Sequence, residues 1–206
     1  MEIVNSLKQQ LSNFLAFILQ LGDRLTVSDV DVTDKIVIWD KDGTVTDSAN
    51  PDERESKILP GVKKAMKAAK FNFIISGIRC TESEQKNFDP DIVIQNLIKL
   101  MEELPISAAA FSPSIGGTTC YVVIRENDNI SVFKAHEDHK YSEYVGKFKK
   151  PDIGMFKVIE DVALQYFRIE IDKANMVMIG DMWQDEAAAN EFGIRFLEAN
   201  LIHEEI

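Results

Sequence analysis

The sequence predicts an α/β fold in which a doubly wound parallel sheet is covered by helices on both faces. Short apolar runs alternate along the chain with segments whose apolar residues recur at helical spacing. Crossovers of this length are right-handed and make the strands that they join parallel. The 206 residues, 45% apolar and 28% charged, are enough for one domain with its own core.

The predicted elements follow one another in the order that this fold requires. The first is an amphipathic helix over residues 3–21, which Gly22 ends. We expect strands at residues 36–40, 71–76, 106–113, 175–180 and 194–197. The intervening helices are expected at residues 61–70, 91–104, 153–167 and 184–192.

Residues 118–136 interrupt the alternation of strands and helices. Two β-rich runs flank Asp128 and Asn129, so we expect an antiparallel hairpin there. The hairpin belongs to an inserted segment, residues 114–149, which is long enough for a partial lid. No repeat or linker divides the chain, and we therefore expect one domain over residues 1–206.

Charge and composition exclude several classes of protein. The net charge of −11 repels a phosphate backbone, which disfavours non-specific binding to nucleic acid. Two cysteines and three histidines are too few for a disulfide scaffold or a structural zinc site. No apolar stretch is long enough to span a membrane, and the N-terminus lacks the pattern of a secretory signal. We expect a soluble, cytosolic protein.

Polar residues gather where the predicted parallel strands end. Ligands of open parallel sheets bind beyond the carboxyl ends of the strands, so these residues are expected at one site. They are Asp40, Asp42, Ser76, Gly77, Asp181 and Asp185, together with Lys150 before the helix at 153–167. Each motif alone also has a structural explanation, since Asp-Gly is a common turn signal and acidic residues favour helix N-termini. Their convergence on one edge favours a functional site.

Four motifs resemble those of a known family of enzymes. WDKDGTVTD, FIISG, KKPDIGM and MIGDMWQDEAAA are similar, in this order, to the motifs of the haloacid dehalogenase superfamily of aspartate-nucleophile phosphatases. The resemblance covers about residues 34–200. The basic residue in DKDGT, the run LPGVKKAMK and the KPxxGM spacing are most similar to the third subclass, which includes histidinol-phosphate and polynucleotide 3′-phosphatases.

The resemblance implies a set of catalytic roles. Asp40 is implied as the nucleophile that forms an aspartyl-phosphate, and Asp42 as the general acid and base. Lys150 is implied to hold both the nucleophile and the phosphate, while Ser76 donates a hydrogen bond to a phosphoryl oxygen.

The resemblance also implies a magnesium ion, because two anions approach each other only when their charge is neutralised. The implied ligands are Asp40, the backbone carbonyl of Asp42, Asp181 and Asp185. Residues beside the motifs are expected to contact the substrate, and Gly43 allows a sharp turn beneath the phosphate. These residues are Gly43, Thr44, Gly77, Arg79 and Trp183.

The substrate is predicted from the space around the site. Between Thr44 and Phe71 there is room for only one helix, so a large cap is not expected there. An open site favours a phosphate carried by a macromolecule, and our leading hypothesis is a phosphoprotein, with phosphotyrosine as one option. The alternatives are a polynucleotide 3′-phosphatase, a sugar or histidinol phosphatase, and an inactive module that keeps the fold and binds a partner.

Overall fold

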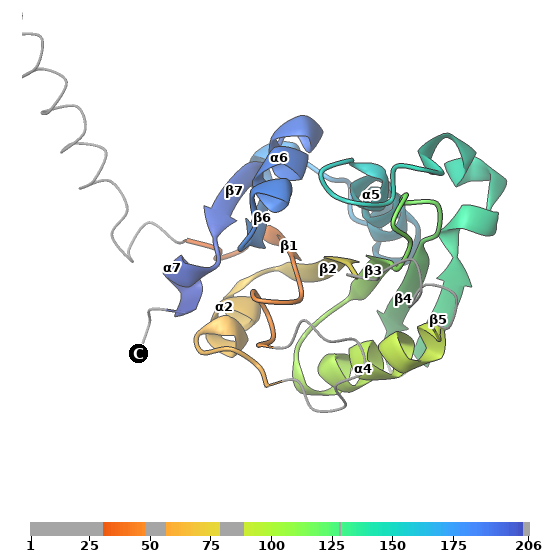
Figure 1. Ribbon diagram of the computed structural model, residues 1–206. Coiled ribbons are helices and arrows are strands. Elements are labelled where there is room, and N and C mark those ends of the chain that lie inside the picture. Colours follow the sequence, from red (N-terminus) through yellow and green to blue (C-terminus); the bar gives the residue numbers. More distant parts are fainter. Residues whose placement is uncertain (1–30, 48–56, 79–88, 128, 204–206) are drawn as a thin grey trace, which may run out of the picture. The chain divides into compact units, whose positions relative to one another are not determined.

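The computed structural model describes residues 31–47, 57–78, 89–127 and 129–203 (Figure 1). The described residues from Val32 onward form one compact unit. The helix expected at residues 3–21 and the candidate residue Arg79 lie outside the described residues.

A seven-stranded sheet with the order β5-β4-β3-β2-β1-β6-β7 forms the centre of this unit. Five neighbouring strands run parallel, which confirms the predicted α/β class with a mostly parallel sheet. They are β1 (Ile36–Trp39), β2 (Phe71–Gly77), β3 (Ala108–Ser112), β6 (Met176–Gly180) and β7 (Arg195–Glu198). Trp39 lies opposite Ile74 of β2 and Ile179 of β6, so these three strands end side by side.

The central strands are mostly apolar because the sheet is covered on both faces, and the exceptions include Asn72 of β2 and Ser112 of β3. All residues of β1 and β3 are buried. The indole of Trp39 donates a hydrogen bond to Asn72 (2.9 Å), whose amide donates to the Met66 carbonyl (2.8 Å). This polar pair is therefore satisfied inside the core, as buried polar groups must be.

Helices lie on both sides of the sheet (Figure 1). Asp89 caps α4 and accepts a hydrogen bond from the Asp91 N–H, and a left-handed Gly193 ends α6. The α-helices are α2 (Val62–Ala68), α4 (Pro90–Glu103), α5 (Gly154–Phe167), α6 (Trp183–Phe192) and α7 (Asn200–His203). The 3₁₀ helices are η2 (Ala135–Glu137), η3 (His139–Tyr144) and η4 (Lys173–Asn175). Among the described residues, no helix has the length and apolar content needed to cross a bilayer.

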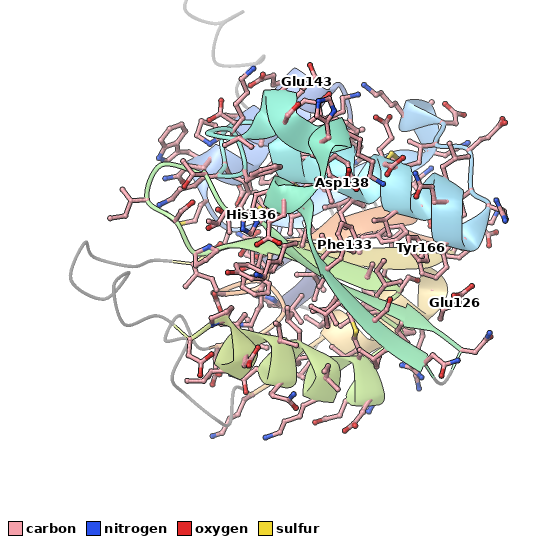
Figure 2. The ribbon with its side chains drawn as sticks, turned by 90° about the vertical axis from the view of Figure 1, so that its right-hand side faces the viewer. Glu126, Phe133, His136, Asp138, Glu143 and Tyr166 are labelled. Atoms are coloured by element: carbon pink, nitrogen blue, oxygen red, sulfur yellow. The ribbon has the colours of Figure 1, made fainter. Side chains whose placement is uncertain are left out.

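The predicted hairpin forms, but it extends the central sheet. Its strands β4 (Tyr121–Glu126) and β5 (Asn129–Lys134) pair antiparallel, and β4 pairs antiparallel with β3. The inward side chains of β4 join the main core, because they continue its apolar surface. Figure 2 shows this edge, with Glu126 near the hairpin tip and Phe133 leading to His136. The two strands therefore bury their apolar face against the sheet, and whether the rest of residues 114–149 acts as a partial lid stays a prediction.

Candidate active site

The site lies where β1, β2 and β6 end. The N–H of Asp40 donates to the carbonyl of Ile179 (2.9 Å), which continues the parallel pairing of β1 and β6 by one residue. Asp40 thereby lies beside the residues that follow Ile179, and Gly77 ends the neighbouring strand on the other side. The three strand ends thus bring residues from distant parts of the chain together.

A cavity of about 240 Å³ opens at these strand ends. It is large enough for a phosphoryl group with accompanying water molecules. Its lining is dominated by charged and polar side chains. The lining residues are Asp40, Asp42, Gly77, Lys149, Lys150, Met182, Gln184 and Asp185.

Three carboxylates form an acidic cluster at this cavity. Asp40, Asp181 and Asp185 each offer an oxygen, and these oxygens all lie within 4.8 Å of one another. Asp40 and Asp185 are buried, with exposed fractions of 7% and 1%, while Asp181 is exposed. Three carboxylate oxygens this close together repel one another, and a set of carboxylate oxygens suits Mg²⁺. The donor set therefore fits the ion that the sequence implied.

Lys150 supplies positive charge to this cluster. Its ammonium contacts the carboxylates of both Asp40 and Asp185, the latter at 2.5 Å. Burial lowers the pKa of Lys150, but the two carboxylates outweigh that effect and hold it above its ordinary value of 10.5. Lys150 is therefore a permanently charged link between two of the three acidic residues.

The nucleophile candidate has a perturbed acidity. Burial raises the pKa of Asp40 to about 6, the charge of Asp185 adds to this rise, and Lys150 opposes it. Additional positive charge near Asp40 would lower this pKa again and favour the ionised carboxylate. A divalent cation in the acidic cluster would supply that charge.

Residues 40–46 form a tight turn after β1, which we call the catalytic turn. The N–H groups of Val45 and Thr46 both donate to the carbonyl of Lys41, at 2.8 and 2.9 Å. Gly43 takes a positive φ of 87°, which favours glycine. The turn leaves the Asp42 side chain lining the cavity, where it contacts the ammonium of Lys41.

Two glycines make room for the acidic cluster. A Cβ on Gly43 would lie 2.3 Å from Oδ2 of Asp181, and one on Gly180 would lie 2.6 Å from Oδ2 of Asp185. Real Cβ atoms do not approach so closely, so any side chain at either position displaces a carboxylate. Glycine is therefore required at positions 43 and 180, because a larger residue would collide with Asp181 or Asp185.

The other predicted residues are placed differently. Ser76 is 2% exposed at the end of β2 and lies outside the cavity lining, whereas Gly77 lines it. Trp183 begins α6 with 65% of its surface exposed and is likewise outside the lining. Thr44 is fully buried, so its expected contact with substrate is wrong, because the catalytic turn points it into the protein.

Three lining residues were not among the predicted site residues: Lys149, Met182 and Gln184. Lys149 precedes Lys150, and Gln184 precedes Asp185 in the first turn of α6, so each lies next to a motif residue. Their position inside the motifs KKPDIGM and MIGDMWQDEAAA was the available signal in the sequence. It does not say which neighbour faces the cavity, because that depends on the backbone direction at each position.

The comparison with protein families gives one finding. The sequence profile of the family described as HAD-hydrolase-like matches residues 148–198, which is less than half of the chain. The matched span contains Lys150, Asp181 and Asp185. No curated protein matches the sequence.

Two solved structures are similar to this chain at low identity. One is a D,D-heptose 1,7-bisphosphate phosphatase from B. bronchiseptica complexed with magnesium and phosphate, with 19% identity and a TM-score of 0.47, covering 79% of this chain and 78% of that one. The other is a haloacid dehalogenase-like hydrolase from Brucella suis 1330, with 12% identity and a TM-score of 0.40, covering 84% and 91%. Both TM-scores lie below 0.5.

Proposed function

We propose that the protein is a Mg²⁺-dependent phosphatase that hydrolyses phosphomonoesters through an aspartyl-phosphate on Asp40. The observation that carries this proposal is the position of the Asp40 carboxylate. It lines the cavity, contacts the Lys150 ammonium and belongs to a cluster of three carboxylates. The match of residues 148–198 to HAD-hydrolase-like proteins supports the same activity.

The reaction has two steps that use the same two carboxylates. A carboxylate oxygen of Asp40 attacks phosphorus, and the bond from phosphorus to the leaving oxygen breaks as the acyl-phosphate bond forms. Asp42, which lines the same cavity, donates a proton to the leaving oxygen. It then accepts a proton from the water that attacks the phosphoryl group, which releases inorganic phosphate and restores Asp40.

Charge neutralisation is the remaining requirement. Asp40, Asp181 and Asp185 would hold the magnesium ion, with the Asp42 carbonyl as the further ligand that the family resemblance implies. When bound, the ion supplies the positive charge that lets a phosphate dianion approach a carboxylate. Lys150 also contacts Asp40, and the buried environment strengthens this ion pair.

For the substrate, we propose a phosphate carried by a protein. Trp183 and Met182 expose 65% and 36% of their surfaces next to the lining residue Gln184. Exposed apolar side chains beside a polar cavity are suited to contact a peptide or the ring of a phosphotyrosine. A small phosphate ester is the second candidate, because a cavity of about 240 Å³ accommodates a compact leaving group. The net charge of −11 disfavours a 3′-phosphorylated nucleic acid.

The direct test is hydrolysis of p-nitrophenyl phosphate with and without Mg²⁺. We expect turnover with Mg²⁺, none after EDTA treatment and none in Asp40→Asn. Asp91→Asn, which changes an exposed carboxylate on α4, is the matched control and should retain full activity. A wild-type protein that binds Mg²⁺ and phosphate without turnover would instead indicate a binding module.

A panel of four phosphate esters distinguishes the substrate classes. It contains a phosphotyrosine peptide, a phosphoserine peptide, histidinol phosphate and a 3′-phosphorylated oligonucleotide. We expect the highest kcat/KM on a peptide. Preference for histidinol phosphate would favour the second candidate, and turnover of the oligonucleotide alone would exclude both.

A further inference from the structure

The C-terminal end of the described chain contacts β6, the strand that ends directly before Asp181. The N–H of Ala199 donates to the carbonyl of Gly180 (2.8 Å), the residue directly before Asp181. The following residues form α7, whose last described residue is His203. We call residues 199–203 the C-terminal clamp.

The same segment contacts the catalytic turn. Nε2 of His203 lies 2.8 Å from the carbonyl oxygen of Thr44, although the two residues are 159 positions apart in the sequence. Because a carbonyl only accepts, the imidazole donates from Nε2. The C-terminal clamp thus joins the turn that carries Asp40 and Asp42 to the end of β6.

The Thr44 carbonyl belongs to a fully buried residue. Buried carbonyls need a hydrogen-bond donor, because burial removes them from water. Within the turn, the N–H groups of Val45 and Thr46 donate to the carbonyl of Lys41 and not to that of Thr44. His203 supplies the donor to Thr44 from outside the turn.

The C-terminal clamp is also held by tight packing. A Cβ on Gly61 would lie 1.9 Å from the carbonyl oxygen of Ile202, so the residue before α2 makes very close contact with α7. Gly61 adopts a φ of 74°, which favours glycine. His203 is therefore presented to Thr44 from a helix that is fixed against both β6 and the start of α2.

We propose that His203 is a positioning residue of the active site. By holding the Thr44 carbonyl, it keeps the catalytic turn aligned with β6, so that the nucleophile and the proton donor face the acidic cluster. The inference rests on the proposed phosphatase function. It assigns a role in catalysis to a side chain that does not line the cavity.

Two substitutions separate the hydrogen bond from the bulk of the side chain. His203→Leu keeps a side chain of similar size but has no donor, whereas His203→Gln retains an N–H at a similar reach. We expect kcat to fall about tenfold or more in His203→Leu with KM nearly unchanged, because small misalignments of catalytic groups slow the reaction. His203→Gln should keep most of the wild-type kcat. His139→Leu, which changes an exposed histidine in η3, is the control and should be fully active.

Binding of Mg²⁺ alone, measured by calorimetry, provides a readout that does not depend on turnover. We expect His203→Leu to bind the ion several-fold more weakly than the wild type, and His203→Gln to bind it normally. A wild-type protein that binds Mg²⁺ but hydrolyses no ester would overturn the phosphatase proposal, while this comparison of affinities would still test the clamp. Equal losses in the Leu and Gln variants, or no loss in either, would overturn the positioning role of His203.

Discussion

Gly43 and Asp181 come from different strand ends and are in direct contact. The space in which a Cβ of Gly43 would lie is filled by the Asp181 carboxylate, with Oδ2 at 2.3 Å. The catalytic turn and the exposed member of the acidic cluster are therefore packed together without a gap. The first prediction follows from this contact.

Gly43→Ala should abolish most of the activity, because the new methyl group displaces Asp181. Gly146→Ala is a matched control, since Gly146 has a similar φ of 90° but no atom lies within 4 Å of its Cβ position. Both variants should lose about 1 kcal/mol of stability from backbone strain. Only Gly43→Ala should weaken Mg²⁺ binding and lower kcat, and equal kinetic effects in both would contradict the steric explanation.

Lys150→Met should reduce kcat by about 10²-fold or more, because it removes the charge that contacts Asp40 and Asp185. Lys147→Met changes an exposed lysine of the same segment and should leave kcat unchanged. Steady-state kinetics on p-nitrophenyl phosphate at saturating Mg²⁺ would measure the difference. A Lys150→Met variant with near wild-type kcat would show that the ammonium is not needed for catalysis.

Mg²⁺ should raise the melting temperature of the wild type, since a ligand that binds the native state stabilises it. Asp185→Asn should lose this shift, because Asp185 is a member of the acidic cluster and is only 1% exposed. Glu102→Gln, on the exposed side of α4, serves as the control and should show the wild-type shift. The measurement is thermal unfolding after treatment with EDTA, with and without added Mg²⁺. An undiminished shift in Asp185→Asn would place the ion elsewhere.

The contact between η3 and α5 should make stability depend on pH. Asp161 accepts a hydrogen bond from the Tyr141 hydroxyl (2.5 Å) and pairs with Lys140 at 2.8 Å. Burial alone would raise the pKa of Asp161, but these partners together lower it below the ordinary value of 3.8. Its stabilising contribution is therefore present above pH 3.8 and is lost as the pH falls through the lowered pKa.

Asp161→Asn should thus be less stable than the wild type at neutral pH, and the difference should shrink in acid below pH 3.8. Urea unfolding at a series of pH values would measure both free energies. The effect is expected to be small, because Asp161 is partly exposed to solvent. A difference that grows as the pH falls would contradict the assigned direction of the pKa shift.

Two features could be predicted from the amino-acid sequence alone: the parallel part of the fold, and the sheet edge at which the acidic residues gather. Apolar runs alternating with helical segments are compatible with few other arrangements, and parallel strands end at a common edge. Asp40 and Asp181 could be expected together for that reason alone. The motif order along the chain added the catalytic roles that the resemblance implies.

The three-dimensional structure was needed to learn which side chains face the cavity and which contacts hold them there. Thr44 turns into the protein while Lys149 lines the cavity, because side-chain direction in a turn depends on local backbone angles that no periodic pattern encodes. The hairpin joined the sheet since its apolar face continues the core. His203 and Thr44 are 159 positions apart in the sequence, and their contact arises because α7 packs beside the catalytic turn in the folded protein. No local sequence pattern indicates which distant elements will pack together.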